Sequence, residues 1–309
     1  MKPFEDVIGH EAVLDLLRSE LADPAQAYLF VGPANVGKAK VAREFAAAMV
    51  ADGDDDAYRR AATGAHPDVI VVAPEGRTAI TVEQARSVVS SAVLSPLEAA
   101  RKVFLFEEAS MLNEGAANAL LKTIEEPIGS TAFVLVADAE TDLPITIASR
   151  CRTVVFGRVA TDEVEDGLVR IVGLDADDAA EAARIAGGRP GLALSLATEP
   201  LTVAFRDAWL AVPEGLTDHP GDAYRLAGSV LDATDPLLAS IRNRQEHDLR
   251  ALYGSEEPPK SVMERQQREI KRTEDALAVT GLELLASFYR DTAAAQLGAP
   301  VQNPDVTVS

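Results

Sequence analysis

The stretch AYLFVGPANVGKAKVAREFAAA, residues 27–48, decides the fold of this chain. It begins with five apolar residues, which is typical of a buried strand, and it ends in an alanine-rich segment that favours a helix. Between the two, Gly32 to Ala39 has the spacing of a phosphate-binding P-loop, whose pattern is GxxxxGK followed by Ser or Thr. Only the last position departs from the pattern, and the strand before the loop and the helix after it are the context that a P-loop requires.

The candidate nucleotide-binding residues are five positions of this loop, Gly32, Asn35, Gly37, Lys38 and Ala39. The two glycines let consecutive backbone N–H groups point inward, where the positive end of the following helix adds to their attraction for phosphate. Lys38 would supply a point charge for the outer phosphates. Ala39 lacks the hydroxyl that normally binds Mg²⁺, and losing a contact to a charged group costs about 1.5–3 kcal/mol. The sequence therefore predicts a degenerate P-loop, at which ATP binding stays open and Mg²⁺ binding is weak or absent.

The charge and composition of the chain exclude several classes of function. Its 309 residues suffice for two or three domains. With 49 acidic and 29 basic residues, the net charge of −20 opposes long-range attraction to nucleic acid, so the isolated chain is expected to bind DNA poorly. A single cysteine and four scattered histidines predict no metal site of the His or Cys type. Without a bilayer-length apolar stretch or a signal peptide, we expect no membrane contact and a cytoplasmic location.

Further short apolar runs predict four more strands. They lie at residues 69–73, 103–106, 133–137 and 153–156. Helical patterns separate most of these runs, and one of the helices begins at a capping box, Thr81 to Gln84. Strands that alternate with helices predict an α/β fold, a three-layer sandwich with a parallel five-stranded sheet covered on both faces.

Two acids, Glu107 and Glu108, follow the run at 103–106. In P-loop ATPases such a strand delivers an Asp that organises Mg²⁺ and a Glu that polarises the attacking water. Glu107 is one methylene longer than the expected Asp, whereas Glu108 stands at the position of the water-activating acid and is the candidate catalytic acid. Together with Ala39, Glu107 alters both halves of the metal site, which argues against hydrolysis.

Several longer motifs carry a resemblance to a known family. They are RKVFLFEEASMLNEGAANALLKTIEEP at 101–127, TAFVLVADAETDLPITIASRC at 131–151, HPDV at 66–69, ITVEQAR at 80–86 and LSPLEAARK at 94–102. In this order and spacing they resemble the AAA+ clamp-loader ATPase family, and within it the delta-prime subunits of bacterial DNA polymerase III. The resemblance covers roughly residues 4–157. It implies a P-loop AAA+ domain over 1–157, a small helical lid over 158–200 and an all-α collar over 201–309.

This resemblance also implies a function. Clamp-loader subunits form a hetero-pentamer, here with gamma/tau and delta subunits, which opens a sliding clamp and places it on primed DNA. Delta-prime subunits hydrolyse little or no ATP and complete the ATP site of a neighbour with the arginine of a Ser-Arg-Cys motif, which carries over to Arg150, acting in trans. Zinc is not carried over, because the four-cysteine module of many relatives is missing from this sequence. The alternative is an active gamma/tau-type ATPase that tolerates Ala39 and Glu107.

The last third of the sequence is helical in pattern. Separate helices are expected over 201–212, 222–231 and 236–252, followed by one long or broken helix over 260–297. The tail from residue 299 to 309 is expected to fray, as chain ends commonly do.

Overall fold

The computed structural model describes residues 3–74, 79–126, 129–198, 200–253 and 260–306. The chain divides into two compact units, one made of Met1–Gly173 with Gly188–Gly191 and the other of Leu174–Gly187 with Leu192–Ser309. The predicted division into three parts, with boundaries after residues 157 and 200, stays a prediction.

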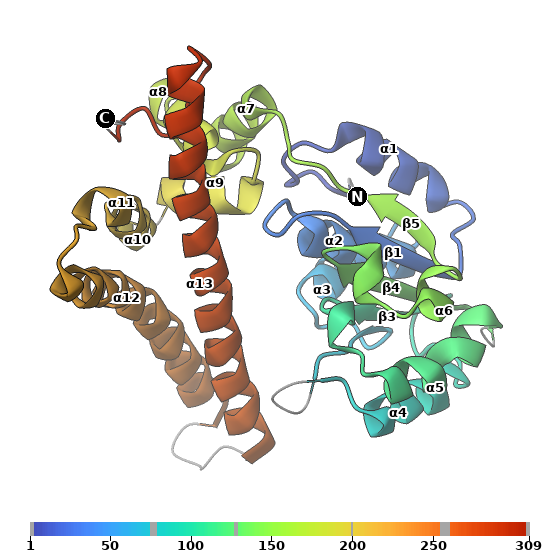
Figure 1. Cartoon of the computed structure of the whole chain (residues 1–309). Helices are drawn as coiled ribbons and strands as arrows, with labels where there is room; N and C mark the ends of the chain where they lie inside the picture. The colour runs from blue at the N-terminus through green and yellow to red at the C-terminus, as the bar shows by residue number, and fades with distance from the viewer. Residues whose placement is uncertain (1–2, 75–78, 127–128, 199, 254–259, 307–309) are drawn as a thin grey trace. The chain divides into compact units, whose positions relative to one another are not determined.

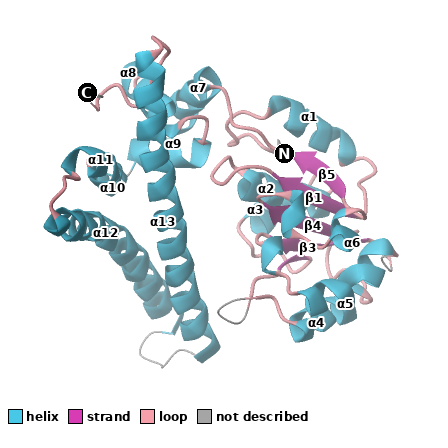
Figure 2. Cartoon of the chain, in the orientation of Figure 1, coloured by secondary structure: helices cyan, strands magenta, loops and turns pink. Residues whose placement is uncertain are grey.

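A parallel sheet forms the centre of the first unit (Figure 2). Its five strands are β1 Ala27–Val31, β2 Val69–Val71, β3 Lys102–Phe106, β4 Thr131–Ala137 and β5 Arg152–Val155. They lie in the order β2-β3-β4-β1-β5, and every neighbouring pair is parallel. The strands predicted from the apolar runs are confirmed, although β2 ends two residues before the predicted end.

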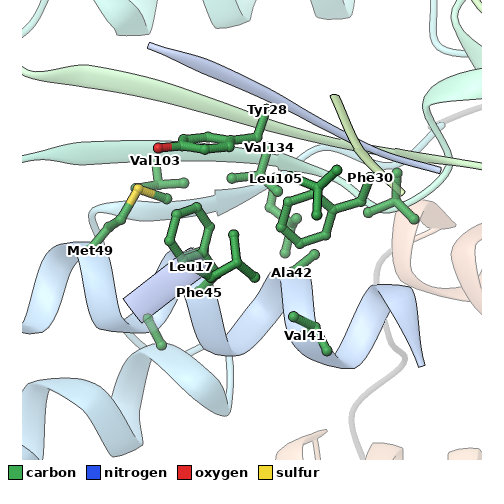
Figure 3. Close-up of a cluster of buried hydrophobic side chains, with 14 of the residues drawn as sticks. Leu17, Tyr28, Phe30, Val41, Ala42, Phe45, Met49, Val103, Leu105 and Val134 are labelled. Carbon is green, nitrogen blue, oxygen red and sulfur yellow. The ribbon is translucent and has the colours of Figure 1, made fainter. Parts of the chain in front are cut away.

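Helices cover both faces of this sheet (Figure 1). Alternate side chains of a strand point to opposite faces, so Tyr28 and Phe30 of β1 pack with Phe45 of α2 (Figure 3), whereas Leu29 packs on the side of α4 and α5. The predicted three-layer sandwich is therefore confirmed. The helices of this unit are α1 Glu11–Glu20, α2 Lys38–Ala51, α3 Asp55–Ala62, α4 Val82–Ala92, α5 Glu114–Glu125, α6 Ile145–Ala148 and α7 Thr161–Val172, with 3-10 turns at Ala109–Met111 and Glu140–Asp142.

A buried carboxylate fixes the loop that leads into β3. Asp68, directly before β2, has no exposed surface and accepts N–H groups of Leu97, Glu98 and Ala99 at 2.7, 2.8 and 2.9 Å. Burial by itself would raise the pKa of Asp68, but these three donors and the nearby His66 hold that pKa below its ordinary value. Asp68 of the motif HPDV at 66–69 therefore stabilises the loop before β3.

The second unit is helical in its described residues. Its helices are α8 Ala176–Ala186, α9 Pro190–Thr198, α10 Pro200–Leu210, α11 Val212–Gly215, α12 Pro220–Tyr253 and α13 Lys260–Gln296. The first two residues of α9 still belong to the first unit. The prediction of separate helices over 222–231 and 236–252 is wrong, because α12 continues through Pro236. A proline removes one helical hydrogen bond. Pro236 is exposed, so water can satisfy the carbonyl that this proline leaves without a donor.

The C-terminal segment is also more ordered than predicted. Arg206 on α10 is 4% exposed and binds both carboxylate oxygens of Asp305, at 2.8 and 2.9 Å. Asp291 on α13 accepts the backbone N–H groups of Gln302 and Asn303 at 3.0 and 2.7 Å. The prediction that the tail frays is therefore wrong for residues 302–305, because buried polar partners hold this segment; residues 307–309 lie outside the described part.

Candidate functional site

The loop after β1 adopts the curled backbone that the P-loop pattern predicts. Gly32, Asn35 and Gly37 have φ angles of 150°, 62° and 103°. At Gly32 a side chain would not fit, since a Cβ atom there would lie 2.2 Å from the carbonyl oxygen of Phe156. The helix α2 then begins at Lys38, so its N-terminal N–H groups face the loop. This backbone is suited to hold phosphate oxygens.

A pocket of about 400 Å³ lies in front of this loop. Parallel strands place their carboxyl ends at one edge of the sheet, where ligands of such sheets commonly bind. The loop after β1 and the residues after β3 and β4 therefore line the same pocket. The predicted site residues at its wall are Asn35, Gly37, Lys38, Ala39 and Glu108, and they are joined by Glu107, Asp138 and Gly191. The structure thus brings together the predicted P-loop residues and the predicted catalytic acid.

The ammonium of Lys38 is bound inside the chain. Lys38 is 6% exposed, and its Nζ donates to the carbonyl oxygens of Gly32 and Pro33 and, at 2.9 Å, to Oδ1 of Asp138. Asp138 was not predicted as a site residue. The signal that could have found it is its place directly after β4, because β4 is the strand that pairs with β1.

Glu107, the acid at the expected metal position, pairs with an arginine. Nε of Arg43 donates to Oε1 of Glu107, and a second guanidinium nitrogen donates to Oε2 at 2.9 Å. These hydrogen bonds to Glu107 raise the pKa of Arg43 above its ordinary value. Arg43 was not predicted as a site residue either. The signal that could have found it is its position four residues after Ala39, which places both residues on the same face of α2.

These residues fit a phosphate group better than a metal ion. The glycine-rich backbone can hold phosphate, whereas Ala39 offers no oxygen ligand and Glu107 is paired with Arg43. In the part of the chain that the structure describes, no group of three or more His, Cys, Asp or Glu side chains is placed to bind a metal ion. The expectations for ATP, Mg²⁺ and zinc stay predictions.

The structure does not place Arg150 near this pocket. Arg150 lies in the turn between α6 and β5, and β5 pairs with β1 in the register Tyr28 to Arg152. Arg150 therefore precedes the amino ends of the strands, whereas the P-loop follows their carboxyl ends. At about 3.3 Å per residue, the length of β1 alone separates these edges by about 15 Å.

The guanidinium of Arg150 and its acidic partner are both accessible to solvent. Its Nε donates to Glu125 at the end of α5 at 3.1 Å, and another nitrogen donates to the carbonyl oxygen of Thr146 at 2.9 Å. The Arg150 side chain is 33% exposed and that of Glu125 is 54% exposed. The next residue, Cys151, packs against the apolar cluster of α4 and α5, and burial raises the pKa of its thiol to about 12. Cys151 is therefore an apolar anchor of the turn, and Arg150 faces outward.

Comparison with known proteins finds a family model that is similar to this region. Residues 9–160 match the family model described as DNA polymerase III, delta subunit. This part of the chain, slightly less than half of it, is similar to that family. It contains the P-loop, both acids after β3 and the turn with Arg150. The predicted P-loop AAA+ class of fold agrees with this match and with the observed sheet.

Curated relatives include subunits of more than one type. The chain is 40% identical over 139 residues to DNA polymerase III subunit delta' of Pseudomonas aeruginosa, which covers 42% of this chain and 42% of the relative. It is 31% identical over 179 residues to DNA polymerase III subunit tau of Bacillus subtilis, which covers 55% of this chain and 31% of the relative. The alignments thus span less than half the length of either relative.

The chain also shows a distant likeness to solved structures. The chain aligns with a DNA polymerase III gamma subunit-related protein of Thermotoga maritima with 19% identity, 89% and 91% coverage of the two chains, and a TM-score of 0.42. Separately, none of the described helices has the length and apolar character needed to cross a membrane.

Proposed function

We propose that this chain is a delta-prime-type subunit of the bacterial DNA polymerase III clamp loader. In this role it works in the cytoplasm within a hetero-pentamer of gamma/tau and delta subunits, which loads a sliding clamp onto primed DNA. Its own ATP hydrolysis is weak or absent, and Arg150 completes the ATP site of a neighbouring subunit. The match of residues 9–160 to the family model and the relatives named delta' support the proposal.

The observation that carries the role of Arg150 is its position on the sheet. It lies at the opposite edge from its own P-loop, and its side chain is one-third exposed. A guanidinium in that place cannot reach a phosphate held by Lys38, but it is available to a phosphate held by another subunit. An arginine finger stabilises the charge that develops on the transferred phosphoryl group, an effect of about 10³ to 10⁵ in rate.

The test is single-turnover ATP hydrolysis by a loader rebuilt from purified subunits, clamp and primed DNA. With Arg150→Ala we expect hydrolysis at the neighbouring site to slow by about 10³. Arg152→Ala is the matched control, because this second arginine of the same segment pairs within its own unit with Glu20 at 2.7 Å. Equal rates for the wild-type loader and the Arg150→Ala loader would exclude the finger role.

The alternative function is an active gamma/tau-type ATPase, which the match to a tau subunit favours. The isolated chain would then hydrolyse ATP, and Lys38→Ala would abolish the turnover. We expect negligible turnover instead, because Glu107 is paired with Arg43 and Ala39 offers no ligand for Mg²⁺.

A further inference from the structure

All three N–H donors of the Lys38 ammonium are engaged within the first unit. A lysine ammonium has three donors, and the three acceptors here are the carbonyl oxygens of Gly32 and Pro33 and the carboxylate of Asp138. Two of these acceptors are neutral. Asp138 is the one that carries charge, so it is the partner that neutralises Lys38. A phosphate oxygen must displace at least one acceptor before Lys38 can bind to it.

The sheet itself holds Asp138 beside the P-loop. Asp138 follows Ala137, the last residue of β4, which pairs with Val31 of β1. The carbonyl oxygen of Asp138 also accepts the N–H of Gly32 at 3.1 Å. Because β1 and β4 are buried neighbours at the centre of the sheet, the carboxylate stays next to the first residue of the loop. The contact to Lys38 is therefore built into the strand pairing.

The charges of the pocket wall add to this effect. Three acids line the pocket, Glu107, Glu108 and Asp138, against two lysines, Lys38 and Lys40. Lys40 is also paired, since its Nζ lies 2.9 Å from an oxygen of a glutamate on the next turn of α2. An incoming triphosphate would bring further negative charge to a wall whose own acids already outnumber its lysines, and like charges at close range repel.

We propose that Asp138 acts as an internal substitute for phosphate, which neutralises Lys38 and keeps the affinity of this P-loop for nucleotide low. The inference rests on the proposed function and deepens it, because it names the side chain that keeps the subunit from using ATP. Even after a nucleotide displaces Asp138 from Lys38, the carboxylate stays at the pocket wall and repels the phosphates. Removing its charge therefore favours binding twice, by releasing Lys38 and by ending the repulsion.

The test is a calorimetric titration of the full chain with ATP, with and without Mg²⁺. Asp138→Asn keeps the shape and one acceptor oxygen of the side chain but removes its charge. We expect this variant to bind ATP about tenfold more tightly than wild type, because ATP no longer has to replace a charge-assisted contact between Asp138 and Lys38. Glu140→Gln is the matched control, because it removes an exposed acid two residues further along. Its affinity should change by less than about twofold, since exposed charges are screened.

Two results would overturn the inference. One is equal affinity for wild type and Asp138→Asn, and the other is an equal gain in Asp138→Asn and Glu140→Gln, which would assign the effect to total charge. Thermal unfolding in the same buffer checks the fold, and Asp138→Thr provides a second uncharged variant. The side chain of Asp138 is 69% exposed, so we expect both variants to stay folded.

The failure of this inference can be told apart from the failure of the proposed function. The titration uses the isolated chain and does not involve Arg150. If Asp138→Asn binds ATP no better while Arg150→Ala slows the neighbouring site, the inference fails and the proposed function stands. If Asp138→Asn gains affinity while Arg150→Ala has no effect, the inference stands and the finger role fails.

Discussion

Lys38 and Arg150 are the two cations that sequence motifs assign to phosphate, and the fold gives them opposite surroundings. Lys38 is 6% exposed and binds two carbonyl groups and Asp138. Arg150 is 33% exposed, and its acidic partner Glu125 is 54% exposed. An exposed ion pair contributes only about 0–1 kcal/mol, so Arg150 can leave its partner at little cost. Lys38 is itself buried and would have to give up contacts to two carbonyl oxygens and a carboxylate. The comparison teaches that a motif residue is available to a ligand only where its contacts within the chain are weak.

The largest effect is expected at Asp68, which is a fully buried charge and therefore the strongest contrast to the exposed Arg150. Asp68→Ala removes the carboxylate that accepts the N–H groups of Leu97, Glu98 and Ala99. We expect the free energy of unfolding to fall by about 3 kcal/mol, since three backbone N–H groups lose the buried carboxylate that accepts them. Urea unfolding of the full chain measures this loss. A loss below about 0.5 kcal/mol would show that water replaces the carboxylate, and the expected difference between buried and exposed charges would then be contradicted.

The same carboxylate predicts a pH dependence. Because the folded-state pKa of Asp68 is lowered, its stabilisation is complete above the unfolded-state value and is lost as the pH falls through the folded-state value. We therefore expect wild-type stability to fall below about pH 4, and Asp68→Asn to fall less steeply over the same range. Urea midpoints measured from pH 6 down to pH 3 check this sign. Parallel curves for the two proteins would contradict it.

Lys38→Met and Arg150→Met compare the two cations directly. Lys38→Met leaves the carbonyl oxygens of Gly32 and Pro33 without this donor, and we expect a loss of about 1–2 kcal/mol in unfolding free energy. Arg150→Met should change that free energy by less than about 0.5 kcal/mol, because the side chain is exposed. The two variants serve as controls for each other in urea unfolding. Equal losses would break the comparison.

The smallest effect is expected at the partner of Arg150. Glu125→Gln should change the unfolding free energy by less than about 0.5 kcal/mol, because the ion pair is exposed. Hydrolysis at the neighbouring site of the rebuilt loader should stay within about threefold of wild type. Glu126→Gln, at the next exposed acid, is the matched control. A tenfold acceleration confined to Glu125→Gln would show that Glu125 restrains Arg150 and would weaken the contrast with Lys38.

The parts of the fold that the sequence predicted correctly depend on local patterns. Apolar runs predicted the strands, and the spacing of Gly32 and Gly37 predicted the curled loop, because backbone preferences act over a few residues. The missed site residues depend on distant pairs instead. Asp138 is 100 positions from Lys38, and Glu107 is 64 positions from Arg43. No local pattern encodes such partners.

The second unit repeats this lesson. The sequence predicted its helices, but it predicted a break near Pro236 and a frayed tail. The structure shows a continuous α12 and a segment held by the buried Arg206 and Asp291. In the tail, tertiary contacts satisfy polar groups that local rules leave without partners, and at Pro236 the exposed position leaves the freed carbonyl open to water.

The sequence by itself determined that a P-loop lies between a buried strand and a helix, that acids follow β3, and that an arginine precedes the last strand. Only the tertiary structure decided which charges meet. Parallel pairing brings the ends of β1, β3 and β4 to one edge, so Asp138 reaches Lys38 there, and it leaves Arg150 at the other edge. The physical reason is that electrostatic contacts depend on distance in space, which strand order and register set, and not on separation along the chain.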